Sequence, residues 1–376
     1  MSNINEADFL SSLERVAAVA AANAAAVDQQ ARFPEETLAA LRAEGLLALL
    51  SATSVGGQGG TLRHAARAVE RVGRECGSSA MVLCMHYCGT AVIEKFGDEA
   101  TRKDIASGKH LSTLAFSEQG SRSHFWAPIS TATKVEGGYK LDAHKSWITS
   151  AAHATAYVWS SKPSSAEGAS SIWLVSKSAK GLKTTAAFDG LGLRGNDSAP
   201  VSAEGVIVAE SARLGADGGG FDVMMGVVLP AFSLLNSACS VGLMEAAVTR
   251  AIAHITGTKH QHLNSSIADI PTVRAYLSKA KLRADAARTL WEDSLAALET
   301  GRADAQLRVL QVKALTNESA LEVTDLAMRV CGGAAFRKEN GVERAFRDAR
   351  AGFVMAPTSD ALYEFMGRAL VGLPVF

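Results

Sequence analysis

Two short segments of the sequence combine polar residues with glycine or an aromatic ring where a strand would end. Leu114–Ser123 has the sequence LAFSEQGSRS and passes from a β-prone run into a polar turn. Backbone N–H groups in such a turn can bind carbonyl or phosphate oxygens, although an ordinary strand exit explains the same pattern. In the segment AHKSWITS, Trp147 stands two residues before Thr149. An aromatic ring that can pack against a planar ligand therefore lies near a hydroxyl donor. Packing of the ring in the core is the alternative.

A third pattern is a polar stripe on a predicted helix. Small polar residues are spaced there at i, i+3, i+4 and i+7, at Ser233, Asn236, Ser237 and Ser240. These spacings share one helix face, which favours either a polar ligand or a close contact with another helix. Thr358-Ser359-Asp360 opens the last predicted helix with N-capping residues, where free N–H groups can also receive an anion.

Metal and phosphate-loop chemistry have little support in this sequence. Cys84 and Cys88 stand four residues apart, but His86 points away from their helix face and no second Cys/His cluster completes a zinc site. We therefore predict buried thiols and no metal. The sequence also has no GxxxxGK[ST] loop, no GxGxxG after a first strand and no GxSxG turn.

Composition bounds the class of protein. Of 376 residues, 48% are hydrophobic and 20% are charged, which is typical of a globular chain with a large core. Lys+Arg and Asp+Glu are both 38, so the net charge is zero, which disfavours nucleic-acid binding and mildly favours a homo-oligomer. Five cysteines without a disulfide framework, after a polar and acidic N-terminus, predict a cytoplasmic protein.

One uncharged run has the length of a membrane span. Residues 223–244 carry no charge, but they contain Pro230 and the polar stripe, and no basic or aromatic anchors flank them. We expect a buried helix of a bundle and no membrane span.

Periodicity divides the chain into three parts. Residues 1–110 have helical spacing. Residues 111–213 form short β-prone runs separated by turns, which predicts a β-barrel or sandwich. Residues 214–376 return to helical spacing in long segments, which predicts an up-and-down helical bundle. The predicted fold class is α+β, with an N-terminal helical domain, a central β domain and a C-terminal bundle.

In this order the segments resemble the acyl-CoA dehydrogenase family of flavoproteins over nearly the whole chain. The motifs that carry the likeness are Leu114–Ser123, Ala143–Ser150, Leu191–Ser198, Leu214-Gly215 with Gly218–Phe221, Cys331-Gly332-Gly333 and Glu343–Arg350. They are similar to two flavin-binding motifs, a GxRxSxT-like segment, the glycine-rich entry to the bundle, and the late GG and ERxxRDAR motifs. The resemblance implies noncovalently bound FAD, an acyl-CoA or similar small-molecule substrate, an electron acceptor that the sequence does not name, and a homotetramer.

The resemblance also implies which residues hold the cofactor. Backbone groups of Phe116 and Ser117 and the segment Trp147-Ile148-Thr149 would meet the isoalloxazine ring. Ser123 would lie near the cofactor phosphates or the substrate. Gly332, Gly333 and Thr358 would contact the adenine half, partly from a neighbouring subunit. Asp360, in the first turn of the last helix, is a further predicted cofactor contact and an alternative candidate base.

The chain departs from the family at the catalytic base. Typical members carry a glutamate just before the last helix or on the first long bundle helix, where this chain has Ala356 and Phe232. The family's RxxFG segment is replaced by residues 258–262. An apolar side chain cannot accept a proton, so we predict an atypical member. His124, in the flavin turn, is the predicted catalytic residue because a histidine titrates near neutrality.

Three functions follow from these residues. The first is an FAD-dependent oxidoreductase of the acyl-CoA dehydrogenase type. The second, on the same fold, is a monooxygenase that borrows reduced flavin such as FMN, or an enzyme that cleaves a C–S bond. The third is a non-catalytic subunit of a heteromeric dehydrogenase.

Overall fold

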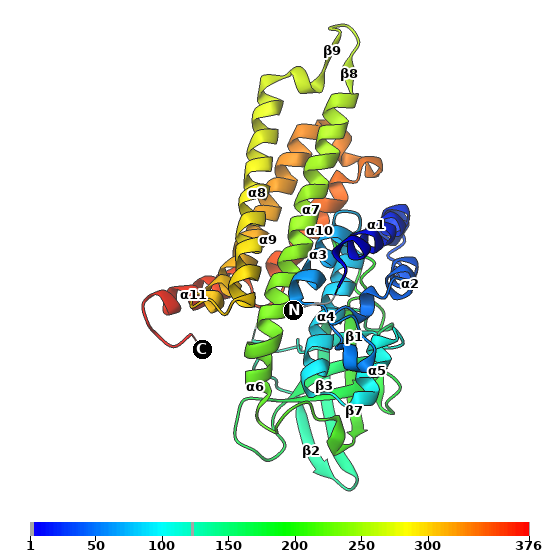
Figure 1. The fold of residues 1–376 in the computed structure, drawn as a ribbon, viewed down its shortest axis with the longest axis vertical. Coiled ribbons are helices and arrows are strands. Elements are labelled where there is room, and N and C mark those ends of the chain that lie inside the picture. Colours follow the sequence, from blue (N-terminus) through cyan, green and yellow to red (C-terminus); the bar gives the residue numbers. More distant parts are fainter. Residues whose placement is uncertain (1–3, 122–123, 376) are drawn as a thin grey trace.

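The computed structural model describes residues 4–121 and 124–375. A sandwich of strands lies at one end of the long axis and the β8–β9 hairpin at the other, with the helices between them (Figure 1). The predicted α+β class, with helices before and after a central β part, is confirmed. The helices of the first part are α1 (Glu6–Gln29), α2 (Glu35–Ala43), α3 (Leu62–Gly73), α4 (Gly77–Phe96) and α5 (Glu99–Ala106).

The β part is a sandwich of two sheets. Its strands are β1 (Ser112–Ala115), β2 (Thr131–Val135), β3 (Gly138–Ile148), β4 (Ala156–Ser161), β5 (Ser171–Ser176), β6 (Leu182–Thr184) and β7 (Ala199–Val208). The sheet orders are β1-β4-β5 and β2-β3-β7-β6, and β1 runs parallel to β4. Trp159 and Trp173 from the first sheet pack with Leu141 and Val206 from the second, and this apolar layer holds the sheets together.

The C-terminal part is a bundle around one buried helix. Its elements are α6 (Gly220–Val223), a π-helical turn (Met224–Val228), α7 (Leu229–Gly257), β8 (Lys259–His260), β9 (Ser265–Ser266), α8 (Pro271–Glu299), α9 (Ala305–Cys331), α10 (Val342–Val354) and α11 (Ser359–Leu370). The helical stretch Gly220–Gly257 is long and apolar enough to cross a membrane, but 94% of its most apolar window is buried inside the fold. It is therefore the core helix that the sequence predicts.

Two helical segments give no clear apolar period in the sequence, each for a physical reason. Helix α5 buries only Ile105, so it shows no apolar period. The helix that leads into α7 starts at Gly220, ten residues before Pro230. Proline lacks the N–H that would bond to the carbonyl of Gly226, and the π-helical turn lies where that bond is missing, so the helix continues through the proline.

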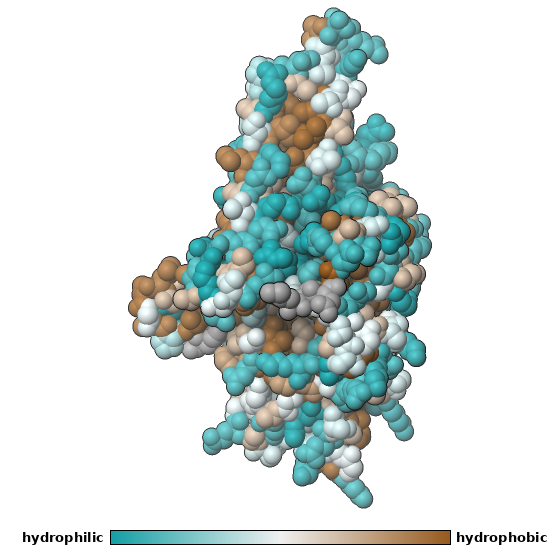
Figure 2. Space-filling view, in the orientation of Figure 1, coloured by the Kyte–Doolittle hydropathy of each residue, from teal (hydrophilic) through white to brown (hydrophobic). Residues whose placement is uncertain are grey.

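Apolar side chains stay exposed on the bundle. Figure 2 shows apolar atoms gathered at the end of α11, where Leu370, Val371 and Leu373 are exposed. On α8, the side chain of Leu282 is also largely exposed. Single exposed apolar residues are common, but a contiguous group marks a contact surface.

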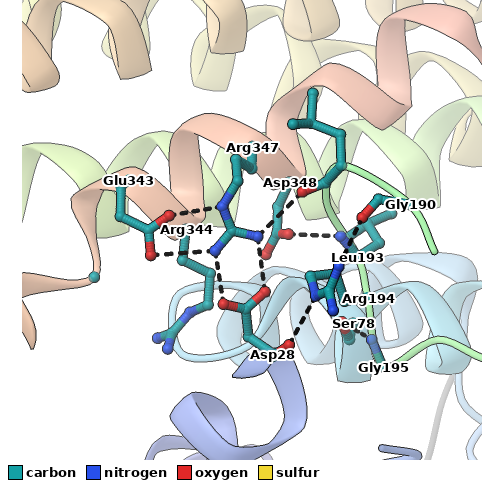
Figure 3. A network of polar contacts seen from close by, with 12 residues as sticks. Asp28, Ser78, Gly190, Leu193, Arg194, Gly195, Glu343, Arg344, Arg347 and Asp348 are labelled. Carbon is teal, nitrogen blue, oxygen red and sulfur yellow. Dashed lines mark hydrogen bonds and ion pairs between the residues drawn. The ribbon is translucent and has the colours of Figure 1, made fainter. Parts of the chain in front are cut away.

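An ion-pair network joins the first and last parts of the chain. Arg347 on α10 forms a double hydrogen bond with the Asp28 carboxylate of α1, at 2.8 and 2.6 Å, and it also binds Glu343 and the carbonyl oxygen of Leu191 (Figure 3). The Arg347 and Asp28 side chains are only 16% and 6% exposed. A bidentate pair at this depth fixes α1 against α10.

Replacing Arg347 by methionine should therefore destabilise the fold. The substitution leaves the Asp28 carboxylate buried without its partner, which typically costs about 3 kcal/mol of unfolding free energy. Urea unfolding followed by circular dichroism measures the change. The matched control is Arg15→Met, which removes the exposed pair with Glu44 and should change little. Equal effects of the two substitutions would contradict the structural importance of Arg347.

Candidate functional site

A cleft of about 660 Å³ lies where the sandwich meets the helices. This volume is within the range of small-molecule and cofactor sites. Three walls enclose it, and each is a short stretch of chain at the end of a regular element. The sandwich wall consists of Phe116–Gly120 and Ser146–Thr149, the loop wall of Phe188–Ser198, and the bundle wall of Val228, Leu229, Phe232 and Ala351–Pro357.

A β-bulge aims Trp147 into the cleft. Burial alternates along β3 up to Lys145, but the register with β7 shifts between Lys145 and Ile148, and Trp147 has φ of 59°. A bulge of this kind re-aims a side chain. Trp147 is consequently 62% exposed, while Ile148 is buried. The Trp147 ring packs beside Phe188 of the loop wall, with 4.2 Å between centroids.

Backbone strain is concentrated around this cleft. Six non-glycine residues of the described chain have positive φ, and four of them are Trp147, Ser150, Leu193 and Asp197, in or beside the sandwich and loop walls. Such conformations cost about 1–3 kcal/mol each and persist only where surrounding contacts impose them. Their clustering at one cavity indicates a functional site.

Buried polar contacts hold the loop wall in place. The Asp348 carboxylate on α10 accepts a hydrogen bond from the Leu193 N–H at 2.6 Å, and the Ser78 hydroxyl accepts one from the Gly195 N–H at 3.1 Å (Figure 3). Gly192 has no room for a side chain, since a Cβ there would lie 2.4 Å from the carbonyl oxygen of Arg347. The loop wall is therefore pressed directly onto the backbone of α10.

A buried ion pair holds the sandwich wall. Lys145 on β3 donates to Glu118 at 2.5 Å, and Glu118 also accepts hydrogen bonds from the Ser130 hydroxyl and from the N–H groups of Ile129 and Ser130. Burial acts to raise the pKa of Glu118, but the charge of Lys145 and these hydrogen bonds outweigh it and lower the pKa. Glu118 is thus an ionised structural carboxylate.

The cleft has no free acid or base among the described residues that line it. Glu118 and Arg194 are the only ionisable side chains there, and Arg194 pairs with Asp189 at 2.6 Å. Ala356 and Phe232, the positions where the resemblance implies a glutamate in the family, both line the cleft. Because neither can accept a proton, the walls of this chain can orient and enclose a ligand but cannot abstract a proton by the usual route.

The structure brings together some of the predicted site residues and separates the others. Those that line the cleft are Phe116, Ser117, Trp147, Ile148 and Thr149. Those that do not line it are His124, Gly332, Gly333, Thr358 and Asp360. Ser123 lies outside the described residues.

The residues outside the cleft have other surroundings. His124 is exposed in the turn after Ser121, so the geometry gives a catalytic role no support. Thr358 caps α11, its hydroxyl accepting from the Ala361 N–H at 3.4 Å, and Asp360 is exposed in the first turn. Gly332 and Gly333 are exposed at the end of α9.

The polar stripe of α7 is a helix contact. Its Ser237 hydroxyl accepts from Thr316 of α9 at 2.9 Å, and its Ser240 hydroxyl donates to the amide oxygen of Asn317 at 2.6 Å. Asn317 also donates to Asn236 at 2.9 Å. These contacts support the helix-contact interpretation for three of the four stripe residues, while the hydroxyl of Ser233 is buried without a hydrogen-bond partner.

The predicted buried thiols are present. All five cysteines are buried and free. Burial raises the pKa of the Cys84 thiol well above its usual value, so the thiol is inert at neutral pH. His86 is fixed between the carbonyl oxygen of Leu47 and the N–H of Ser112. No group of His, Cys, Asp and Glu in the described part of the chain could hold a metal ion.

Sequence reasoning missed most of the loop wall and the apolar lining. Examples are Phe188, Leu193 and Asn196, together with Met85 of α4 and Phe125. The signal for the loop wall was the Leu191–Ser198 motif, whose glycines permit the close contact with α10. The apolar lining had no local signal, because its side chains look like core residues until the tertiary fold leaves them open.

Three family models match the chain in the order of its parts. Those for the N-terminal, middle and C-terminal domains of acyl-CoA dehydrogenase match residues 6–108, 113–206 and 218–371. A probable acyl-CoA dehydrogenase of Mycobacterium leprae is 28% identical over 358 residues, which make up 93% of this chain and 91% of the relative.

Two solved structures share the fold. Butyryl-CoA dehydrogenase from Megasphaera elsdenii superposes with a TM-score of 0.89 at 20% identity. The superposition covers 98% of this chain and 99% of the dehydrogenase chain. The structure of PigA with FAD and proline gives a TM-score of 0.89 at 21% identity and covers 98% of each chain.

Asp348, which anchors the loop wall, should make the free energy of unfolding depend on pH. Burial raises the pKa of Asp348 to about 6, against the opposing effects of the Leu193 N–H, Arg344 and Arg347. A raised carboxyl pKa favours folding while the group is protonated, so this contribution is full at low pH and is lost as pH rises through about 6. The stability of the native chain relative to Asp348→Asn should thus fall between about pH 5 and pH 7.5, by about 1–3 kcal/mol. Urea unfolding at both pH values measures it, and a constant difference would contradict it.

Proposed function

The chain belongs to the acyl-CoA dehydrogenase family, and on this premise we propose that it is a flavin-dependent oxidoreductase that holds FAD in the cleft. We propose an acyl thioester or a similar small molecule as its substrate. The observation that carries the proposal is the sandwich wall, where Phe116–Ser117 and Trp147–Thr149 come together from separate strands at one cavity.

The residues of the cleft fit a flavin ring. The Trp147 ring is turned outward by the bulge, and the Thr149 and Ser198 hydroxyls lie 3.5 Å apart in the same lining. An exposed aromatic face beside hydroxyl groups suits a planar ring with polar edges. Phe116, Ser117, Trp147 and Thr149 would hold the flavin, which when bound supplies a two-electron acceptor.

The bundle wall suits an uncharged, apolar group. Leu229, Phe232, Met355 and Ala356 present no charge to the cleft. They would exclude water from the reacting part of the substrate and orient it against the sandwich wall, which are contributions of binding and position. No side chain of the described lining is a free base for the substrate's proton, and this observation favours the second candidate below over a simple dehydrogenation.

A second candidate is a reaction on the same fold that needs no protein base. Ala356 and Phe232 favour it, because a monooxygenase that takes up reduced FMN or FAD, or an enzyme that cleaves a C–S bond, does not depend on α-proton removal by a glutamate. A non-catalytic subunit remains the third candidate.

We also propose that the chain forms a homo-oligomer, a tetramer by its family, in the cytoplasm. The exposed apolar group at the end of α11 and Leu282 of α8 supply contact surface. Gly332, Gly333, Thr358 and Asp360 lie outside the chain's own cleft, so we propose that they serve the cofactor bound to a neighbouring copy. The five free, buried thiols support a reducing compartment.

Flavin binding and reduction test the proposal. The purified chain should bind FAD, quench its fluorescence and be bleached anaerobically by at least one acyl-CoA of a chain-length panel. Trp147→Ala should weaken FAD binding about tenfold or more, because stacking on an aromatic ring is worth about 1–3 kcal/mol. Ile207→Ala, which shortens an exposed side chain on β7 outside the cleft, is the matched control.

The outcomes separate the three candidates. Oxygen consumption with added reduced FMN, and no bleaching by any acyl-CoA, would support the second candidate. A chain that binds no flavin would overturn the proposal and leave the non-catalytic subunit.

Restoring a carboxylate should restore proton abstraction. Ala356→Glu is expected to exchange the α-protons of butyryl-CoA with D₂O at least about 100-fold faster than the native chain, because a positioned general base contributes about 10²–10⁴-fold. Mass spectrometry of the recovered thioester measures the exchange. Ala356→Gln, with similar volume and no basicity, should stay at the native rate. Rapid exchange by the native chain would reveal a base that the cleft lining does not contain.

A further inference from the structure

A buried lysine lies behind the bundle wall. Lys313 of α9 is 1% exposed. Its ammonium group donates to the carbonyl oxygens of Gly352 at 3.3 Å, Met355 at 3.0 Å and Pro357 at 2.8 Å. Three backbone bonds use all three donors of the side chain, so the group is fully satisfied and its position is fixed.

The three carbonyls belong to the corner between α10 and α11. The last carbonyls of a helix have no partner within it and must bind something else when they are buried. Here Lys313 is that partner. The same corner carries Met355, Ala356 and Pro357 to the cleft, so the lysine determines where this part of the bundle wall stands.

The same ammonium group also contacts the other half of the bundle wall. The Lys313 Nζ lies 5.7 Å from the centroid of the Phe232 ring on α7, within the range of a cation–π contact. Phe232 and Ala356 are the two positions where the family has its glutamate, and they come from different helices. The Lys313 side chain of α9 thus contacts both positions. It meets the Phe232 ring directly, and it holds Ala356 through the carbonyl oxygens of Met355 and Pro357.

We propose that Lys313 is a positioning residue that sets Phe232 and the Met355–Pro357 corner at a fixed separation across the bundle wall. It touches neither cofactor nor substrate and acts through these two supports. The inference rests on the proposed function only in treating the cleft as the place where a ligand binds. The geometry itself is a property of the chain without any ligand.

The surroundings of Lys313 make this clamp sensitive to pH. Among the described residues, the one ionisable group that could act on the charge of Lys313 is the Cys84 thiol of α4, and it is uncharged at neutral pH because burial raises its pKa. Helix α7 presents the Phe232 ring, and the α10–α11 corner presents only carbonyls. Burial without a counter-ion lowers the pKa of Lys313 to about 7. Above that pH the neutral amine has one proton fewer to donate and loses the cation–π contact.

Amide hydrogen exchange of the whole chain tests the clamp without a ligand. In the native chain, after correction for intrinsic rates, peptides covering residues 351–358 should exchange about tenfold faster at about pH 8.5 than at about pH 6. Lys313→Met should exchange fast at both pH values. Lys313→Arg, which stays charged, should remain protected at both. Lys279→Met, on the neighbouring α8 with an exposed ion pair to Glu322, is the matched control and should behave as the native chain.

Ligand binding separates a positioning role from general stabilisation. The affinity of Lys313→Met for FAD, held by the sandwich wall, should stay within about twofold of native, whereas its affinity for butyryl-CoA should fall about tenfold. Equal losses for both ligands would show a purely structural role and overturn the proposal.

Two further outcomes keep the test decisive. If Lys313→Met does not fold, the proposal is tested by amide exchange of the native chain and of Lys313→Arg at the two pH values. Equal exchange of residues 351–358 in the native chain at both pH values would overturn the proposal. If the native chain binds no acyl-CoA at all, the proposed substrate fails, while the exchange data still support or contradict the clamp.

Discussion

The cleft depends on buried charges that bind backbone, because each of its walls includes chain at or beyond the end of a regular element, where helix or sheet hydrogen bonds stop. The Glu118–Lys145 pair holds the sandwich wall, Asp348 holds the loop wall through Leu193, and Lys313 holds the bundle wall through three carbonyls. Each charge is buried, so each hydrogen bond is costly to break. The strained residues around the cleft keep their conformations because these contacts leave the chain no relaxed alternative.

The same arrangement explains why the cleft itself is chemically quiet. The one carboxylate of its described lining is ionised and fully bonded, and the one guanidinium is paired with Asp189. Charges that fix walls cannot also exchange protons with a substrate at neutral pH without releasing what they hold. With Ala356 and Phe232 in its lining, the cleft is a shaped binding cavity, and any redox chemistry there would come from what is bound.

Sequence patterns predicted those parts of this structure that local physics decides. Apolar spacing located α7 and its burial, and turn residues separated the strands of the sandwich. The pairing of Trp147 with Thr149 was visible because both stand in one short motif. The loop wall, Lys313 and Asp348 were not predicted, because their roles come from partners about 40 to 155 residues away. A lysine inside an apolar helical run gives no local sign that it will bind carbonyls of another helix.

The position of Lys313 also explains how the cavity keeps its shape with an alanine at position 356. In this chain the corner at Ala356 is held from behind through its backbone, so the identity of the side chain at 356 does not affect the hydrogen bonds that place it. Among the described residues the Lys313 ammonium group has no acidic partner, and burial lowers its pKa to about 7. At this corner the chain therefore places a titratable cation behind an uncharged wall, and a carboxylate introduced at 356 would gain Coulomb stabilisation from that cation.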